Sequence, residues 1–313
     1  MNTSVSNNIG HTTTAPATKK LALGATVNIP PRRLDFEFST DSERYYYDNN
    51  PFLSTFLTTL SSLFPAGESF FVESVRHYRE RITDPVLKAQ VAGFIGQEAM
   101  HSKEHQGFND MATRQGYPVD KLDRDVTKLL DLAQKVLPKS VQLAATVALE
   151  HYTAIIAEML LRDPEVQQKF SAEARQLWLW HALEENEHKT VAYDVYEKMV
   201  GSYGLRVATM GLTTVIFFAV TFAFHARMLA ADGQLFKFRQ NWNAFKYCWN
   251  GKKFPHNLPL MSHAWELRTT GLVFQDEKYD SLVFNYDYIN KENKNNNNSK
   301  KILYESEKLI ENI

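Results

Sequence analysis

Two segments of this sequence each contain a glutamate followed three residues later by a histidine. The first pair is Glu98 and His101, in GQEAMHSKEH, and the second is Glu185 and His188, in HALEENEHKT. Because three residues make nearly one helical turn, each pair would project from one face of its helix. Carboxylate and imidazole groups placed in this way are typical ligands of Fe(II), Mn(II) or Zn(II). The two pairs therefore predict a metal site built between two helices.

Apolar residues flank both pairs at helical spacing, which predicts that each pair lies in a buried seam. The two seams run Leu87, Val91, Phe94, Glu98, His101, His105, Phe108 and Trp178, His181, Glu185, His188, Ala192, Val195. A single Glu-x-x-His match is more often a surface pair than a ligand pair. Inside a seam, however, carboxylate and imidazole groups are costly unless they are paired or bind a metal. The seams therefore favour the metal site.

A dinuclear site needs further oxygen ligands, one glutamate from each of two other helices. Glu150 and Glu68 each lie in line with apolar residues of their own segments. Glu73 is turned away from Glu68 on the same helix, so only one of them can face inward, and we choose Glu68. The chain length between each glutamate and the following Glu-x-x-His pair suits an antiparallel hairpin. We therefore predict six metal ligands: Glu68, Glu98, His101, Glu150, Glu185 and His188.

Other ionisable residues lie next to these six. His105 and His181 are each about one turn from a predicted ligand, so they could bind metal themselves. We favour a core position or a role in orienting a ligand. Glu184 and Glu187 flank the second pair on other helical faces, and we expect both to be solvated.

The composition limits the function classes. The chain has 313 residues and a formal net charge of −1, so nothing indicates binding to nucleic acid. Its one cysteine, Cys248, excludes a disulfide within the chain and favours a reducing compartment. The polar N-terminal sequence lacks the apolar region of a signal peptide, so we expect a cytoplasmic protein.

One uncharged apolar stretch, Val207–Phe224, is 18 residues long. This length is at the lower limit for a helix that crosses a bilayer. A core helix or a helix on the membrane surface is the favoured alternative, and a true span is the other. Contact with the cytoplasmic membrane is therefore part of the expected location.

The sequence divides into four parts. We expect a disordered N-terminal arm, a helical metal-binding domain, an aromatic C-terminal extension and a low-complexity Asn/Lys tail, over residues 1–33, 34–245, 246–280 and 281–313. Within the helical domain, FPAG at residues 64–67 predicts a helix break. Asp84 before Pro85 predicts the start of a helix that runs to about Arg114.

Several long motifs resemble the bacterial family of predicted metal-dependent hydrolases. They are FPAGESFFVESVRHYRERITDP, FIGQEAMHSKEHQGFN, ALEHYTA and WHALEENEHKTVAYDVY, and the opening IPPRRLDFEF also fits. The resemblance covers about residues 30–245 and departs after about residue 250, for which an altered terminus or reading frame is one interpretation. It implies an all-α fold, a ferritin-like four-helix bundle with an additional long apolar helix and flanking helices. It also implies the same six ligands.

These observations lead to three hypotheses for the function. The first is an enzyme with two divalent metal ions, most simply iron, that uses O₂ to oxidise a small apolar substrate such as a lipid or an aromatic compound. The second is a dinuclear hydrolase that uses Mn or Zn as readily as Fe. The third is a non-catalytic bundle that binds or stores metal. A homodimer is compatible with all three.

Overall fold

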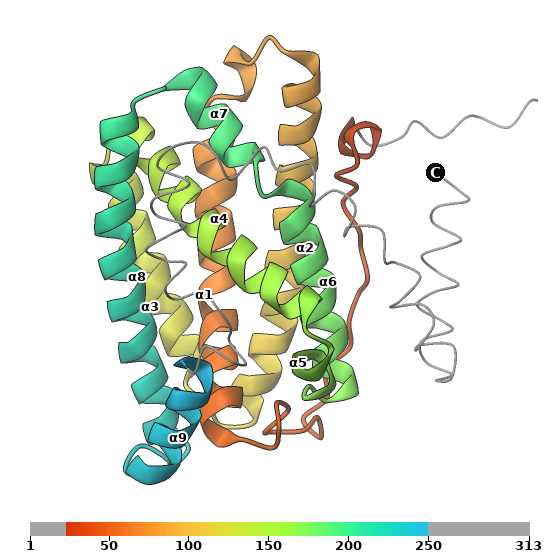
Figure 1. Cartoon of the computed structure of the whole chain (residues 1–313), viewed down its shortest axis with the longest axis vertical. Helices are drawn as coiled ribbons and strands as arrows, with labels where there is room; N and C mark the ends of the chain where they lie inside the picture. The colour runs from red at the N-terminus through yellow and green to blue at the C-terminus, as the bar shows by residue number, and fades with distance from the viewer. Residues whose placement is uncertain (1–22, 250–313) are drawn as a thin grey trace, which may run out of the picture.

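The computed structural model describes residues 23–249, and these residues form an all-α fold, as predicted. Within this range no strand occurs, and one isolated bridge joins Tyr47 to Phe170. Four long helices, α1, α2, α4 and α6, pack around the predicted site (Figure 1). They span Pro51–Arg76, Pro85–Arg114, Lys139–Arg162 and Ala172–His188.

Shorter or peripheral elements complete the described chain. They are η1 (Leu23–Val27), η2 (Arg79–Arg81), α3 (Val119–Val136), α5 (Pro164–Gln168), α7 (Val191–Met199), α8 (Tyr203–Ala231) and α9 (Phe238–Trp249). The predicted extension and tail lie outside the described residues, apart from the end of α9.

The start of α2 follows the sequence prediction. The Asp84 side chain accepts a hydrogen bond from the Val86 N–H at 2.9 Å, and Pro85 occupies the first turn. A capping carboxylate satisfies an amide that has no partner within the helix. The helix then runs to Arg114, as expected, and carries Glu98 and His101 at its middle.

The predicted break at residues 64–67 is wrong, because α1 continues through Pro65. A proline inside a helix has no N–H to donate to the carbonyl four residues earlier, here that of Ser61. The Asn109 side chain of α2 replaces this donor, since its Nδ2 donates to the Ser61 carbonyl at 2.9 Å. A neighbouring helix thus satisfies the group that proline leaves free, and Glu68 stays on a continuous helix.

The end of the predicted disordered arm is ordered in the structure. Residues 23–33 lie along α2, where Ile29 is 3 % exposed. The contact is very close at two glycines of α2. A Cβ atom on Gly93 would lie 2.6 Å from the Ile29 carbonyl oxygen, and one on Gly96 would lie 2.3 Å from Pro31 Cγ. We call residues 23–33 the strap. The expectation of disorder up to residue 33 is wrong for this segment, because the two glycines of α2 let the strap dock closely on the helix.

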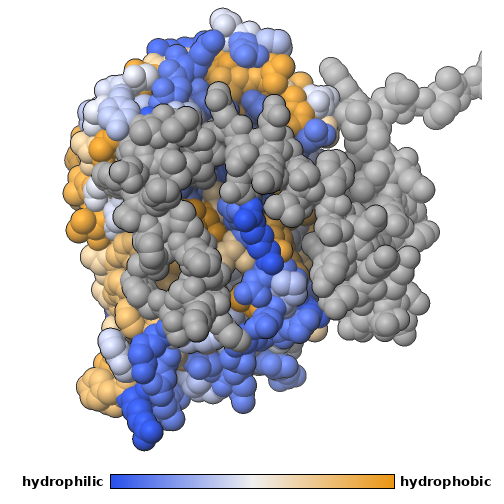
Figure 2. All heavy atoms as spheres, in the orientation of Figure 1, coloured by the Kyte–Doolittle hydropathy of each residue, from blue (hydrophilic) through white to orange (hydrophobic). Residues whose placement is uncertain are grey.

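Two helices in the described chain, α4 and α8, are long and apolar enough to cross a membrane. The most apolar part of α4 is 61 % buried, as expected for a core helix. The corresponding part of α8 is only 17 % buried, although α8 packs against α1 and α4 on one side. Figure 2 shows apolar residues along the edge of the molecule that α8 forms.

Candidate metal centre

The structure brings the six predicted residues together in the interior of the bundle. Their side chains come from four helices, with Glu68 on α1, Glu98 and His101 on α2, Glu150 on α4, and Glu185 and His188 on α6. Each of the six is at most 2 % exposed. The alternative residue Glu73 is half exposed and pairs with Arg76 at the surface. The inward choice of Glu68 therefore matches the geometry.

Glu185 lies at the middle of the cluster. Its Oε1 is 3.5 Å from His101 Nδ1, 3.1 Å from His181 Nε2 and 3.6 Å from His188 Nε2. Three imidazole nitrogens thus converge on one carboxylate oxygen. Burial would raise the pKa of Glu185, but its contacts with His101 and His188 hold that pKa well below its ordinary value.

His188 is oriented by a hydrogen bond on its outer side. Its Nδ1 lies 2.8 Å from Gln97 Oε1, and the Gln97 amide nitrogen donates to the Pro30 carbonyl and to Glu187. Because Gln97 can only accept at Oε1, His188 must donate from Nδ1. Its Nε2 faces the centre, where it lies 3.0 Å from Glu98 Oε1, and this nitrogen carries the lone pair when the ring is neutral. Without a metal, contacts with Glu185 and Glu98 outweigh burial and raise the pKa of His188 well above its ordinary value.

Glu184 and Glu187 are not solvated, so this expectation is wrong. Arg32 of the strap covers them and contacts Glu184 at 3.0 Å and Glu187 at 2.6 Å. Glu184 is fully buried, and its Oε2 lies 3.1 Å from His101 Nε2. This charged contact lies on the outer side of the His101 ring, and Nδ1 on the other side faces Glu185 Oε1 at 3.5 Å.

His181 and His105 belong to a second hydrogen-bonded chain that extends away from the centre. His181 Nδ1 lies 2.7 Å from His105 Nε2, and His105 Nδ1 lies 2.8 Å from Ser61 Oγ. Ser61 Oγ in turn donates to Asn109 Oδ1 at 2.7 Å. Burial lowers the pKa of both histidines, that of His181 to about 4, so both rings are neutral at pH 7.

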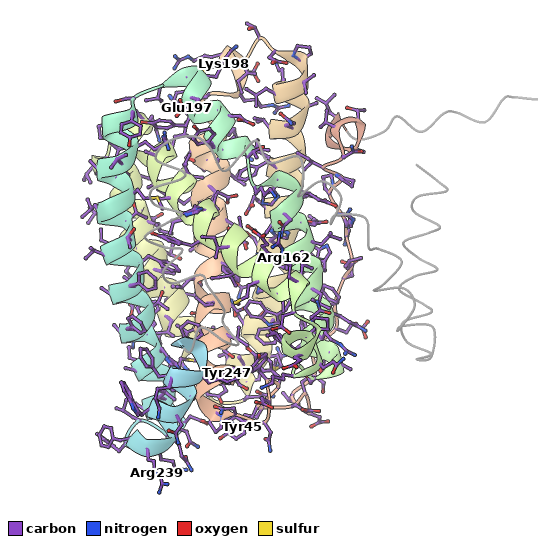
Figure 3. The ribbon with its side chains drawn as sticks, in the orientation of Figure 1. Tyr45, Arg162, Glu197, Lys198, Arg239 and Tyr247 are labelled. Carbon is purple, nitrogen blue, oxygen red and sulfur yellow. The ribbon has the colours of Figure 1, made fainter. Side chains whose placement is uncertain are left out.

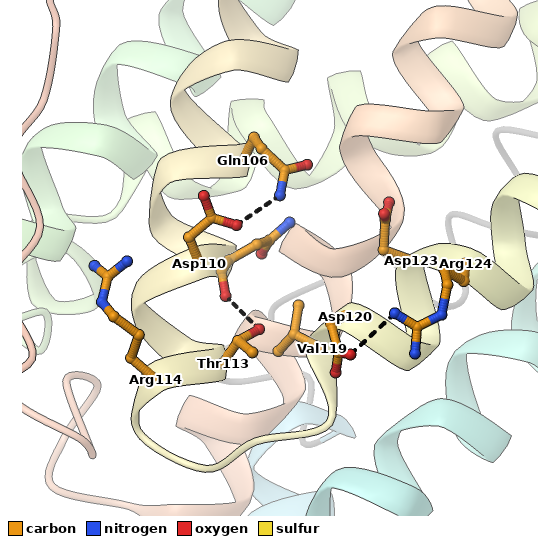
Figure 4. A pocket seen from close by; sticks show the side chains of 9 residues that line it. Gln106, Asp110, Thr113, Arg114, Val119, Asp120, Asp123 and Arg124 are labelled. Carbon is orange, nitrogen blue, oxygen red and sulfur yellow. Dashed lines mark hydrogen bonds and ion pairs between the residues drawn. The ribbon is translucent and has the colours of Figure 1, made fainter.

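Asn109 also lines a polar pocket of about 380 Å³ between the end of α2 and the start of α3. Figure 4 shows the ion pair of Asp120 with Arg124 and the hydrogen bond from Gln106 to Asp110 at its rim. The six clustered residues do not line this pocket. It is therefore separate from the candidate centre.

The cluster has the unsatisfied groups that a cation would satisfy. Both carboxylate oxygens of Glu98 and of Glu150, together with Oε1 of Glu68, are buried without a hydrogen-bond partner. Burial and the charge of Glu98 raise the pKa of Glu68 and Glu150 well above 4.5. Contacts with Glu184 and Glu185 outweigh burial and raise the pKa of His101 to about 10. Without a metal, protons must balance these carboxylates.

The potential ligand atoms form groups of three. Each group has its ligand atoms within 4.8 Å of one another: Glu68, His101, His181; Glu98, His101, Glu185; and Glu98, Glu150, His188. The first and last groups share no residue, and Glu185 lies between them. Oxygen and imidazole donors in this proportion fit a hard or borderline divalent metal ion.

Comparison with known proteins agrees with this geometry. The family of predicted metal-dependent hydrolases matches residues 30–274, so the chain belongs to that family. The expected resemblance is thus confirmed, but its expected end near residue 245 is wrong, because the match continues past α9. No curated protein and no solved structure shows significant similarity to the chain.

Sequence reasoning missed the positions of three residues around the predicted ligands: Gln97 bonds to His188, Glu184 contacts His101, and Arg32 contacts Glu184. Gln97 lies beside a predicted ligand but outside the seam, and Glu184 has the same relation to Glu185. Arg32 lies in the strap, far from both in the sequence. The double arginine after Pro30-Pro31 was the available signal for Arg32, because a cluster of buried carboxylates needs a cation as its partner.

Proposed function

We propose that the centre binds two divalent metal ions, with iron favoured, and that the six predicted residues are their ligands. The observation that carries this proposal is the group of buried carboxylate oxygens without hydrogen-bond partners, which lie beside the imidazole rings of His101 and His188. Glutamates from two helices and Glu-x-x-His pairs from two others are the ligand pattern of ferritin-like di-metal bundles. Manganese and zinc are alternatives with the same donor atoms.

We infer that the protein is an O₂-dependent oxidase or oxygenase of a small apolar substrate. When bound, the ions would supply redox or Lewis-acid chemistry. The residues of the chain would orient the centre through Gln97 and Glu184 and keep bulk water out through the strap. The family description favours a hydrolase as the second candidate. The carboxylate-rich set with imidazoles supports dioxygen chemistry.

Metal analysis by mass spectrometry tests the centre directly. We expect about two ions per chain in the wild type and a loss of metal in Glu150→Ala. Glu158→Ala is the matched control, because Glu158 lies on the same helix and pairs at its end with Arg162, which is labelled in Figure 3. Absence of metal from the reconstituted wild type would overturn the proposal.

The choice between the two chemistries needs a second experiment. Addition of O₂ to the Fe(II)-loaded protein should give a transient absorbance that the Zn(II)-loaded protein lacks. Hydrolysis of ester or phosphoester probes without O₂, equal with Zn and Fe, would instead establish the hydrolase. A stable metal-loaded protein with neither response would indicate a storage function.

We also propose that α8 docks on an anionic membrane surface from the cytoplasmic side. Its exposed stripe is apolar and continuous at helical spacing, with residues Leu212, Val215, Ile216, Ala219, Phe222 and Ala223. Beyond it, exposed Phe236, Phe238 and Trp242 alternate with Lys237 and Arg239, the last at the tip of the molecule in Figure 3. Apolar stripes bordered by aromatic and basic residues suit the surface of a bilayer. A lipid-facing helix would also give an apolar substrate a short route to the bundle.

Flotation with phosphatidylglycerol vesicles tests this contact. The wild type should float, and Val215→Glu should not. Leu132→Glu, at an exposed apolar residue of α3, is the control and should float. A wild type that stays unbound, or that forms a dimer that Val215→Glu disrupts, would overturn membrane docking.

A further inference from the structure

The chain of hydrogen bonds behind His181 has a fixed direction, and this direction determines which nitrogen of His181 carries the proton. The chain begins at the Ser61 carbonyl, which lacks its helical donor because Pro65 follows four residues later. A carbonyl only accepts, so the group that faces it at 2.9 Å must be the Asn109 NH₂. The Asn109 oxygen therefore faces the Ser61 hydroxyl.

The remaining steps follow from the number of protons available. Ser61 Oγ donates its single proton to Asn109 Oδ1 in a hydrogen bond of 2.7 Å. It can then only accept from His105, so His105 carries its proton on Nδ1. Neutral His105 has a bare Nε2, which must accept from His181 Nδ1 at 2.7 Å. His181 consequently presents a bare Nε2 to the centre.

This nitrogen faces another acceptor. His181 Nε2 lies 3.1 Å from Glu185 Oε1, so two lone pairs point toward the same space. The His181 ring is held in this orientation, because it is buried and stacks on the His101 ring at 4.2 Å and 12°. A cation shared by the two atoms satisfies both. The arrangement matches that of His188, whose outer nitrogen Gln97 holds in the same way.

We propose that His181 is a third histidine ligand of the dinuclear centre, and this inference rests on the metal binding proposed above. It completes the group with Glu68 and His101, while His188 serves the group with Glu98 and Glu150. Glu185 lies between the two groups. His105, Ser61 and Asn109 are positioning residues that hold His181 in the tautomer that can bind metal.

Cobalt substitution followed by proton NMR tests the assignment. Each histidine bound to Co(II) gives one strongly shifted, exchangeable ring N–H signal. We expect three such signals in the wild type and two in His181→Gln, which should also bind one of its two ions at least tenfold more weakly. His105→Leu should retain two ions but weaken one of them by about 10- to 100-fold. His225→Gln, a buried histidine elsewhere in the bundle, is the control and should retain all three signals.

The possible failures are distinguishable. Two shifted signals in a wild type that binds two Co(II) ions would overturn the role of His181 and leave the dinuclear centre intact. A wild type that binds no metal would overturn both. Because the wild-type count is decisive by itself, the test does not depend on the folding of a variant.

Discussion

Replacement of Glu150 by leucine should stabilise the metal-free protein. Glu150 is 2 % exposed, and neither carboxylate oxygen has a hydrogen-bond partner. Replacing buried ionisable groups by apolar residues of similar volume is neutral or stabilises a protein by up to about 4 kcal/mol. We expect a gain of about 2 kcal/mol, which corresponds to about 4–8 °C in the unfolding midpoint of a domain of this size.

The gain should depend on pH in a defined direction. Burial and the charge of Glu98 raise the pKa of Glu150 above its ordinary value of 4.5. A carboxyl group whose pKa is raised on folding costs the folded state no stability below its ordinary pKa, and it lowers the free energy of unfolding as the pH rises above that value. The wild type therefore loses stability relative to Glu150→Leu between pH 5 and pH 8. The variant should show its larger advantage at pH 8.

Metal should reverse the order of stability. A ligand that binds only the folded state adds about 2.7 kcal/mol at a concentration 100-fold above its Kd. The wild type should gain this amount with Fe(II) under nitrogen, and Glu150→Leu should gain less. Urea unfolding at pH 5 and pH 8, with metal and with a chelator, measures all four conditions. A Glu150→Leu variant less stable than the metal-free wild type would refute the reasoning, because Glu150 would then have a structural partner.

Three further predictions, two of them with a matched control variant, test the strap and the bundle. Arg32→Met should lower the free energy of unfolding by about 2 kcal/mol in urea titrations, because Glu184 stays buried without its cation. The control Arg33→Met, at the exposed pair with Asp35, should change this free energy by less than about 1 kcal/mol. Gly96→Ala should destabilise the protein and expose the strap to limited proteolysis, because the new Cβ meets Pro31 at 2.3 Å. The control Gly107→Ala, whose Cβ has only ordinary contacts, should stabilise the same helix by about 0.5–1 kcal/mol. Equal effects of the two substitutions would count against close docking of the strap. Burial lowers the pKa of His225 from 6.5 to about 4. The free energy of unfolding of the wild type should therefore fall by up to about 3 kcal/mol relative to His225→Gln as the pH falls from 6.5 to 4. Parallel pH profiles of the two proteins would show that His225 does not titrate in this way.

The positions of the six clustered residues could be predicted because they depend on local regularities. The periodicity of a helix determines which residues share a face, and the length of a hairpin determines which residues return to the same height. Glu68, Glu98 and Glu150 lie together in the interior for these reasons. The buried state of Glu184 depends instead on Arg32, which reaches it from a distant segment. No periodic pattern in either segment encodes that contact.

The helix break was mispredicted for a related reason. Proline removes one intrahelical hydrogen bond, and sequence alone shows no replacement donor. Asn109 of the adjacent helix supplies it. Helix boundaries can thus be read from caps such as Asp84, whereas the tolerance of an irregularity inside a helix depends on tertiary contacts.

Pro65 also limits how this protein can be engineered or can diverge. Replacement by alanine removes a helix-breaking residue and would be a standard choice for raising thermostability. It would also return an amide donor to the Ser61 carbonyl and leave Asn109 free to rotate. The gain in helix stability would then come with a loss of the histidine tautomer that faces the centre. Substitutions at Pro65 and Asn109 are therefore expected to be tolerated as a pair rather than singly.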